Sequence, residues 1–319
     1  MRRILLSTAK IVVSAALLYL ALRKVDLSNL VSRITLGSLV WIGAAIAVTF
    51  LQIFLGALRW REISAMCGAP LETRRAMRYN VIGTFFNQTL PSAIGGDAVR
   101  LWLVARAGAG WRAATYSIFV DRAVGLIALA VLIVGTLPWS YQLIGDPRGR
   151  SALLLVDFAA LAGGLGFLVL GALQWPWLKR WWATHHLHAC AVIANRVLFS
   201  AASGPKVTVL SFLVHLLAVV IAWCLAQSIA APVSFAQVFE LIPPVMLITM
   251  LPISIAGWGV REASLGLAFG FAGLIPSEGV NVSLLLGALS FIVGGIGGLV
   301  WIVSAEKASK GDHAIEVPG

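Results

Sequence analysis

The stretch LPSAIGGDAVR, from Leu90 to Arg100, interrupts a long apolar part of the chain with a proline, two glycines and two charged residues. Proline and glycine end or kink helices, so this stretch predicts a break in a helix. A second stretch, LPISIAGWGVR, runs from Leu251 to Arg261 and is identical to the first at six of eleven positions. A chain that breaks twice in the same way indicates an internal repeat.

The composition places both breaks in a membrane protein. The sequence is 60% hydrophobic and 12% charged, with a mean hydropathy of +0.92, whereas a soluble domain carries about 25% charged residues. Several apolar runs reach the roughly 20 residues that a helix needs to cross a bilayer. Two shorter apolar segments, 79–97 and 236–257, each end in one of the two motifs. We predict full spans, the first of them a retained helix rather than a cleaved signal peptide, at residues 4–22, 38–58, 113–137, 152–173, 207–230 and 282–303.

The basic residues predict the orientation of these spans. Cytoplasmic loops of membrane proteins are rich in Lys and Arg. With a cytoplasmic N-terminus and two short segments that do not cross, sixteen basic residues, Arg59 and Arg100 among them, fall on the cytoplasmic side and six on the other. This bias predicts a multi-pass protein of the inner (cytoplasmic) membrane with both termini in the cytoplasm. It also explains the net charge of +11 without a nucleic-acid partner.

The surroundings of the two motifs extend the repeat. A GAP tripeptide at 68–70 precedes the first motif and an AAP tripeptide at 230–232 precedes the second, each after a full span. Three spans separate the motifs, so the two broken segments enter from opposite faces. We predict an all-α, polytopic membrane protein with about six full spans and two re-entrant broken hairpins in an inverted repeat. Residues 1–304 form one transmembrane domain with repeat halves at about 38–137 and 207–303, and residues 305–319 form a short cytoplasmic tail.

In transporters, broken helices at corresponding positions of two inverted halves of the chain indicate the central substrate site. Non-helical backbone at membrane depth is tolerated where it lines a cavity. In the first motif, a half-helix that starts at Asp97 would aim its positive dipole end and free N–H groups at an anion. The plainer alternative is that Asp97 only caps the helix and Arg100 only reaches the membrane surface. The candidate substrate-binding residues here are Asn87, Pro91, Gly95, Gly96, Asp97 and Arg100.

Asp121 and Arg122 place two charges inside the third span. Ionisable residues within spans are costly and are usually functional. Arg122 could neutralise a lipid phosphate or Asp97, and the alternative is a pair that only fixes helix packing. The second motif carries Trp258 where the first has Asp97, so the two sites differ chemically. Its candidate substrate-binding residues are Pro252, Gly257, Arg261 and Glu262.

Two further groups are candidates for proton coupling. His215 lies in the fifth span and Glu240 early in the second broken segment. Either could carry a proton in a coupled cycle. An interfacial Glu and a hydrogen-bonded helix His are the competing interpretations.

A histidine-rich stretch raises the question of a metal. His186 and Cys190 have a workable ligand spacing, but no partner cluster occurs elsewhere. The run WPWLKRWW, 175–182, is typical of a helix lying on the membrane surface. We therefore expect His185, His186 and His188 on the wet face of that helix, with no metal and no cofactor. The chain has no Walker A loop or other catalytic motif, which argues against ATP hydrolysis by this chain alone.

Three stretches in order carry a family resemblance: NQTLPSAIGGDAVRLWLV (87–104), DRAVGL (121–126) and LPISIAGWGVREASL (251–265). They resemble the flippase-like transmembrane family, the membrane half of the lysyl-phosphatidylglycerol synthases or multiple peptide resistance factors. The resemblance covers nearly the whole chain and implies an all-helical lipid translocase or lipid-handling module. It ends with the last span, and the soluble aminoacyl-transferase domain of bifunctional relatives is absent. The resemblance therefore implies the role of the membrane half alone.

We expect a transporter rather than an enzyme, one that moves a lipid with an anionic or zwitterionic head group between leaflets. One alternative is a membrane-embedded transferase that uses Asp97, Asp121 or Glu262 as a base. Another is a non-catalytic subunit that positions a lipid-modifying enzyme. The expected partner is a membrane lipid, and both a lipid-modifying enzyme and a second copy of the chain stay open as assemblies.

Overall fold

The computed structural model describes Tyr19, Leu30 and residues 32–90, 95–173, 181–250 and 257–304, and these residues are helical without any strand. The predicted span at 4–22, apart from Tyr19, and the predicted tail at 305–319 lie outside the described residues. So do Pro91 and Pro252.

Five of the described helices are long and apolar enough to cross a membrane. Each contains all or nearly all of one predicted span, so these five predictions are confirmed as helices. Several ends differ from the prediction, most of all in α3, which continues past residue 58. The five helices are α3 (Leu36–Met66), α6 (Trp111–Leu143), α7 (Pro147–Ala172), α9 (Gly204–Ser228) and α12 (Pro276–Val303).

Local sequence sets the ends of these helices. Pro147 opens α7, and the Asp146 carboxylate before it accepts hydrogen bonds from the backbone N–H groups of Arg148 and Gly149, at 2.7 and 3.2 Å. Proline at the first helical position has no N–H that would lack a partner, and the Asp before it accepts hydrogen bonds from N–H groups that follow. Gly68, with φ +79°, follows α3 and supplies the left-handed backbone that commonly ends a helix.

Each of the two short apolar segments includes a helix break, and the helices on either side of it pack against each other. The first segment, 79–97, runs from α4 (Thr73–Thr89) into the start of α5 (Gly95–Val104), and α4 packs on α5. The second segment, 236–257, contains α10 (Phe235–Thr249) and ends just before α11 (Val260–Phe271), on which α10 packs. The breaks fall at the two repeated motifs. After α5, the π-helix η1 (Ala105–Ala109) turns the chain into α6, with positive φ at Gly108 and Gly110.

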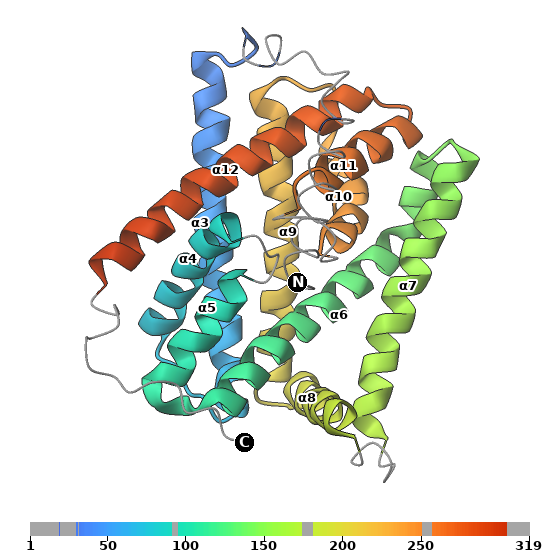
Figure 1. Cartoon of the computed structure of the whole chain (residues 1–319). Coiled ribbons are helices and arrows are strands. Elements are labelled where there is room, and N and C mark those ends of the chain that lie inside the picture. The colour runs from blue at the N-terminus through green and yellow to red at the C-terminus, as the bar shows by residue number, and fades with distance from the viewer. Residues whose placement is uncertain are drawn as a thin grey trace, which may run out of the picture.

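The helices from α3 to α6 and those from α9 to α12 make matching sets of contacts. The first helices of the two series, α3 and α9, pack along each other. α4 packs on α12 as α10 packs on α6, and α5 packs on α6 as α11 packs on α12. In Figure 1 the α4–α5 pair occupies the lower part of the bundle and the α10–α11 pair the upper part.

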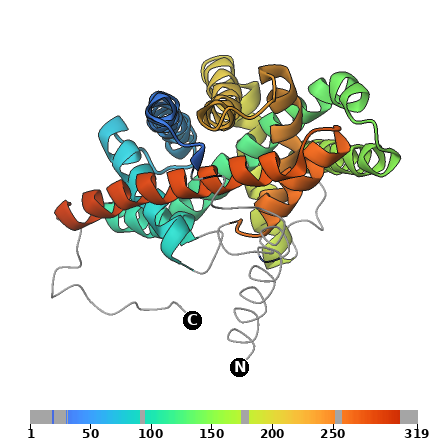
Figure 2. The ribbon, with the colours of Figure 1, turned by 90° about the horizontal axis from the view of Figure 1, so that it is seen from above.

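The last helix, α12, runs obliquely across the bundle and over α4 (Figures 1 and 2). Glycines make this crossing close. A Cβ at Gly297 would lie 2.2 Å from the carbonyl oxygen of Val81, and one at Gly298 would meet the ring of Phe85. Small residues let membrane helices approach to backbone contact. The crossing therefore joins the second series of helices to the first beside the first break.

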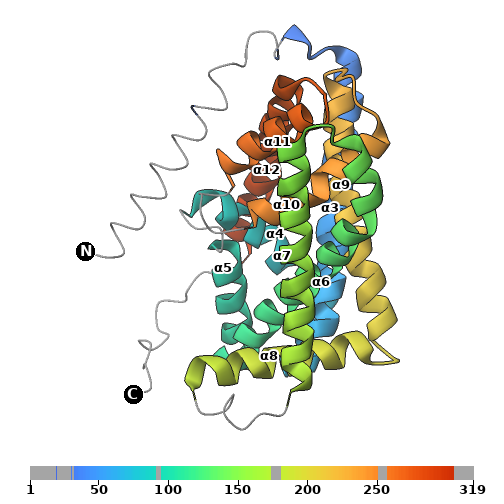
Figure 3. The ribbon, with the colours of Figure 1, turned by 90° about the vertical axis from the view of Figure 1, so that its right-hand side faces the viewer.

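Helix α8 (Trp182–Phe199) lies crosswise at one end of α7 (Figure 3). This position suits a helix on the membrane surface, but the expectation of a wet histidine face is wrong for two residues. Nδ1 of His186 lies 2.5 Å from the hydroxyl of Tyr116, and Nε2 of His188 lies 2.8 Å from the Leu173 carbonyl. Both therefore bind the bundle. Burial raises the pKa of Cys190 to about 11, and no group of three metal-ligating side chains occurs in the described part of the chain.

Candidate functional site

The first motif places its helix through a close contact between α4 and α5. A Cβ at Gly96 would lie 2.2 Å from the carbonyl oxygen of Gly83, so only glycine fits there. The backbone N–H of Gly96 donates to Oδ1 of Asn87 at 2.8 Å. α5 thus begins at Gly95, two residues before the predicted start at Asp97, and Asn87 of α4 satisfies one of its free N–H groups.

The Asp97 carboxylate instead binds two arginines. Nη1 of Arg100 lies 3.0 Å from its Oδ1, and Nε of Arg122 lies 2.6 Å from its Oδ2. Asp121 is held in the same way. Nε of Arg59 lies 2.9 Å from its Oδ1, and Nη2 of Arg100 lies 3.5 Å from its Oδ2. These five side chains from α3, α5 and α6 form one arginine–aspartate cluster.

Arg100 is the fixed centre of this cluster. Its guanidinium contacts both aspartates and lies 4.0 Å from the ring centroid of Trp60, which is fully buried. A cation over an indole face is stabilised by the charge distribution of the ring. By contrast, the side chain of Arg122 is 45% exposed, against 9% for Arg100. Arg122 is therefore the accessible arginine of the cluster.

The cluster carries one positive charge in excess, since three arginines face two aspartates. Nη1 of Arg59 is buried and has no hydrogen-bond partner among the described residues. Gly125 leaves room for this group, because a Cβ there would lie 3.2 Å from it. Each arginine has an aspartate partner, but the net charge of the cluster is positive and one donor is unused, so the site is suited to an added anion.

The second motif builds a closed cluster. Glu262 is fully buried and accepts hydrogen bonds from the Gly259 N–H at 2.6 Å, the Ser283 hydroxyl at 2.8 Å and Nη2 of Arg261 at 3.0 Å. Nε of Arg261 also donates to Ser283, at 2.9 Å. This cluster has one positive and one negative charge, and its carboxylate caps its own helix.

A central cavity of about 550 Å³ lies between the two motif sites. The helices at the first break contribute Asn87 and Asp97, α6 contributes Arg122, and the second break contributes Gly257 and Arg261. The other lining residues are Gln52, Arg59, Gln88, Gly125, Leu126, Val214, His215, Met246, Thr249 and Met250.

The remaining predicted residues lie beside this cavity or away from it. Arg100 and Asp121 line a smaller space of about 180 Å³ that also borders Asp97 and Arg122. Gly95 and Gly96 form the start of α5, and Glu262 is buried beneath Arg261.

The two candidates for proton coupling are in different places. His215 lines the central cavity, and its Nε2 lies 2.8 Å from the Gly125 carbonyl while Nδ1 has no partner among the described residues. Glu240 lines a separate cleft of about 150 Å³ between α7, α10 and α11. The structure brings His215 to the site and leaves Glu240 outside it.

Arg59 and Trp60 are site residues that the sequence did not point out. Arg59 follows the apolar run that ends at residue 58, so the orientation count placed it in a cytoplasmic loop. Arg59 is not in a loop, because α3 continues to Met66 and buries Arg59 against Asp121. The count placed Arg100 in the next cytoplasmic segment, after the first broken segment, and Arg100 is buried too. The signal that could have found Arg59 is the absence of any Gly or Pro between Gly56 and Gly68 to end the helix.

Comparison with known proteins identifies the family. The family described as "Lysylphosphatidylglycerol synthase TM region" matches residues 7–298. The chain belongs to this family. The lysylphosphatidylglycerol synthase TM region thus includes both breaks, the arginine–aspartate cluster and the central cavity. No curated protein and no solved structure matches the chain.

Proposed function

We propose that this protein is a lipid translocase of the inner membrane, which moves a lipid with an anionic or zwitterionic head group between leaflets. The observation that carries the proposal is the central cavity, where two helix breaks meet and where the arginine–aspartate cluster leaves one positive charge uncompensated. A lipid phosphodiester carries one negative charge and would neutralise it. The family assignment agrees with a membrane protein related to lipid modification.

Arg122 is the proposed head-group contact. It is half-exposed at the cavity, and a guanidinium suits the oxygens of a phosphate better than an ammonium does. Arg59 lines the same space, and its unpaired Nη1 is a second donor if the bound head group reaches it. Arg100 and Asp121 position these two arginines, and Arg261 and Asn87 border the head group from the two breaks.

An apolar groove gives the lipid tails a place beside this site. The α6–α7 groove, of about 450 Å³, lies between α6, α7 and α10 and shares Arg122 and Leu126 with the central cavity. Its other lining residues are all apolar. A head group at Arg122 would thus leave its acyl chains in contact with an apolar surface, whereas exposing them to water would cost about 25 cal/mol per Å².

The proposed topology has six full spans, with α4–α5 and α10–α11 as re-entrant hairpins from opposite faces and both termini in the cytoplasm. The matching contacts of α3–α6 and α9–α12 support it, since an inverted repeat pairs each contact with its equivalent. Single cysteines in a variant without Cys67, Cys190 and Cys224 test it. Cysteines at 74 and 106 should label from the same side and one at 148 from the other. Labelling of 74 and 106 from opposite sides would make the first hairpin a full span and remove the inverted repeat.

Reconstitution tests the function. Purified protein in vesicles with a fluorescent phospholipid in both leaflets should render nearly all of the label accessible to a membrane-impermeant quencher, against about half in empty vesicles. Arg122→Ala should abolish this effect, while Arg196→Ala, which removes an exposed arginine of α8, should not. The proposal would be refuted if vesicles with folded wild-type protein made no more label accessible than empty vesicles do.

The transferase alternative is less well supported. Its candidate bases have occupied oxygens, since Asp97 and Asp121 each bind two arginines and Glu262 accepts three hydrogen bonds. A base needs a free oxygen within hydrogen-bond reach of the proton it takes. Product formation from a lipid-linked substrate in the same vesicles would favour it. If the vesicles show neither lipid flipping nor product formation, the result would point to a subunit of a lipid-modifying complex.

Proton coupling through His215 is part of the proposal, because this residue lines the cavity and its Nδ1 has no partner among the described residues. Glu240 is the weaker candidate, since it lies in another cleft. An imposed pH gradient should change the flipping rate of the wild type but not of His215→Gln. An equal response of both proteins would exclude His215 from coupling.

A further inference from the structure

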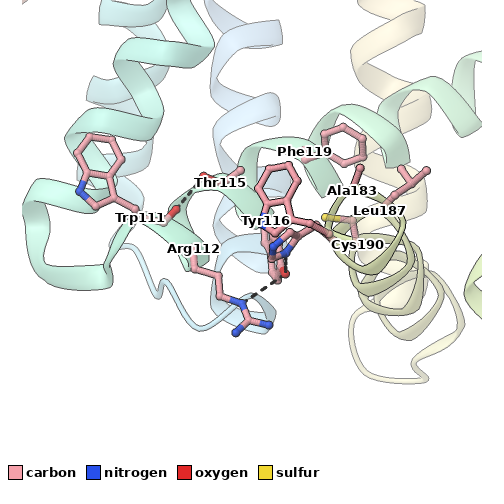
Figure 4. A pocket seen from close by; sticks show the side chains of 10 residues that line it. Trp111, Arg112, Thr115, Tyr116, Phe119, Ala183, Leu187 and Cys190 are labelled. Atoms are coloured by element: carbon pink, nitrogen blue, oxygen red, sulfur yellow. Dashed lines mark hydrogen bonds between the residues drawn. The ribbon is translucent and has the colours of Figure 1, made fainter. Parts of the chain in front are cut away.

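A second cavity lies at the end of the bundle, between the start of α6 and the crosswise helix α8. This interfacial pocket, of about 590 Å³, is lined by Trp111, Arg112, Thr115, Tyr116, Phe119, Trp182, Ala183, His186, Leu187 and Cys190. Figure 4 shows the α6 side chains Thr115 and Phe119 across from Ala183, Leu187 and Cys190 of α8. The walls are mostly apolar, and no residue of the central cavity is among them.

One edge of the pocket is polar. Nε of Arg112 donates to the Tyr116 hydroxyl at 3.3 Å, and that hydroxyl lies 2.5 Å from Nδ1 of His186 (Figure 4). The two terminal nitrogens of Arg112 have no acceptor among the described residues, and Arg112 is exposed. Trp111 and Trp182 flank this edge and are 55% and 79% exposed. Exposed tryptophans beside a cation are typical of the level of lipid head groups.

The interfacial pocket is joined to the α6–α7 groove along one face of α6. Trp111, Thr115 and Phe119 stand four residues apart on that face. Phe119 lines both spaces, and the groove continues through Arg122 to the central cavity. The ring of Phe119 contacts that of Phe167 on α7, with 6.4 Å between centroids. These two rings stand where the pocket meets the groove.

We propose that the interfacial pocket is a loading site for an anionic phospholipid of the surrounding bilayer. The phosphate binds Arg112, one acyl chain lies against the apolar wall between α6 and α8, and the lipid reaches Arg122 past Phe119 and Phe167. The binding site stands on its own geometry, whereas its loading role rests on the proposed translocase function.

The test uses the full-length protein in phosphatidylcholine vesicles that contain phosphatidylglycerol with a photoactivatable diazirine on one acyl chain. After illumination, mass spectrometry should find lipid on peptides that span 111–119 and 182–190. Ala183→Trp places an indole in the pocket and should remove this labelling. Arg112→Ala should reduce it about ten-fold through loss of a charge-assisted phosphate contact. Arg196→Ala removes another exposed arginine of α8 that does not line the pocket, and it should leave labelling unchanged.

The loading role is tested by measuring the lipid flipping rate of the same protein preparations. Ala183→Trp should slow flipping about as much as it reduces labelling, while short-chain phosphatidylglycerol in detergent, added from solution, still stabilises the protein against heating through Arg122. Labelling that persists in Ala183→Trp would overturn the site. Labelling that disappears while flipping stays at the wild-type rate would overturn the loading role and leave the translocase function intact. Normal labelling in a wild type that does not flip would refute the translocase function and the loading role together, and leave only the binding site.

Discussion

The two breaks have nearly the same sequence, yet they form opposite kinds of site. Arg100 and Arg261 occupy equivalent positions of the two motifs, and both are bound by carboxylates at a helix start. At the second break the charges of Arg261 and Glu262 cancel and Ser283 completes the hydrogen bonds. At the first break, the neighbouring helices add Arg59, Asp121 and Arg122 and leave one charge in excess.

The difference comes from the helices around the motifs rather than from the motifs themselves. Ser283 stands 161 residues after Arg122, the same separation as the two motifs, and Trp258 stands 161 residues after Asp97. Upstream of the motifs the separation is 162 residues, as between the GAP and AAP tripeptides, and at that distance from Arg59 the chain has Ile221. In the proposed translocase, a few substitutions would thus keep one half of the repeat as a structural clamp and open the other half to a ligand.

The largest effect on lipid movement is expected at Arg122. Arg122→Ala should abolish flipping and Arg122→Lys should lose most of it, because a lysine cannot hold a phosphate with two parallel hydrogen bonds. Since the side chain is half-exposed, the melting temperature should stay close to that of the wild type. Flipping and thermal stability are measured on the same preparations. Near-wild-type flipping by folded Arg122→Ala would remove Arg122 from the site.

Arg59→Leu should reduce both stability and flipping. It leaves Asp121 buried with only the 3.5 Å contact to Arg100, and the loss of one partner of a buried pair costs about 3–5 kcal/mol. Flipping by the folded fraction should fall about ten-fold through loss of a charged donor. The double variant Arg59→Leu/Asp121→Asn should recover part of the stability and none of the flipping. Recovery of both would make the pair purely structural.

Asp97→Asn should have a moderate effect on flipping. The amide oxygen can still accept a hydrogen bond from Arg122, but the excess charge of the cluster rises from one to two. Flipping of a monoanionic lipid should fall a few-fold, and a lipid with a dianionic head group should be favoured relative to it, as expected for complementary charge. The ratio of the two rates in one series of vesicles is the measurement. An unchanged ratio would show that charge balance does not select the lipid.

Glu262→Gln is expected to have the smallest effect on flipping. The substitution leaves Arg261 without its buried counter-ion and should lower stability by about 3 kcal/mol, while protein that remains folded flips within about two-fold of the wild-type rate. Chemical denaturation in detergent gives the first value and vesicle flipping the second. Full stability with lost flipping would mean that the second break, like the first, acts on the lipid.

Local signals in the sequence predicted the helices well because they depend on nearby residues. The apolar runs gave five spans, and the Pro and Gly residues of the motifs gave both breaks. The start of α5 was misplaced by two residues because its N–H groups are satisfied by Asn87 of another helix, not by Asp97. The charges Asp97, Arg100, Asp121 and Arg122 could be predicted as site candidates, since each is costly in a membrane.

What the sequence did not reveal depends on contacts between distant helices. The role of Arg59 follows from its pairing with Asp121, 62 residues away, and an apolar window that ends at residue 58 assigns it to a loop. His186 was expected to face water, whereas Tyr116 of α6 holds it against the bundle. Neither contact leaves a pattern in the local sequence.

The excess charge of the arginine–aspartate cluster also bears on membrane voltage. Its three arginines are anchored in helices by buried partners, so in a translocase built this way they stay in place and the travelling charge is that of the head group alone. A monoanionic lipid then carries one elementary charge across, and each 100 mV changes the free energy of that step by about 2.3 kcal/mol. A potential that is negative inside would drive such a lipid outward without any chemical fuel, whereas a zwitterionic lipid would be insensitive to it. An imposed potassium diffusion potential should therefore change the flipping rate of the monoanionic lipid and leave the rate of the zwitterionic lipid unchanged.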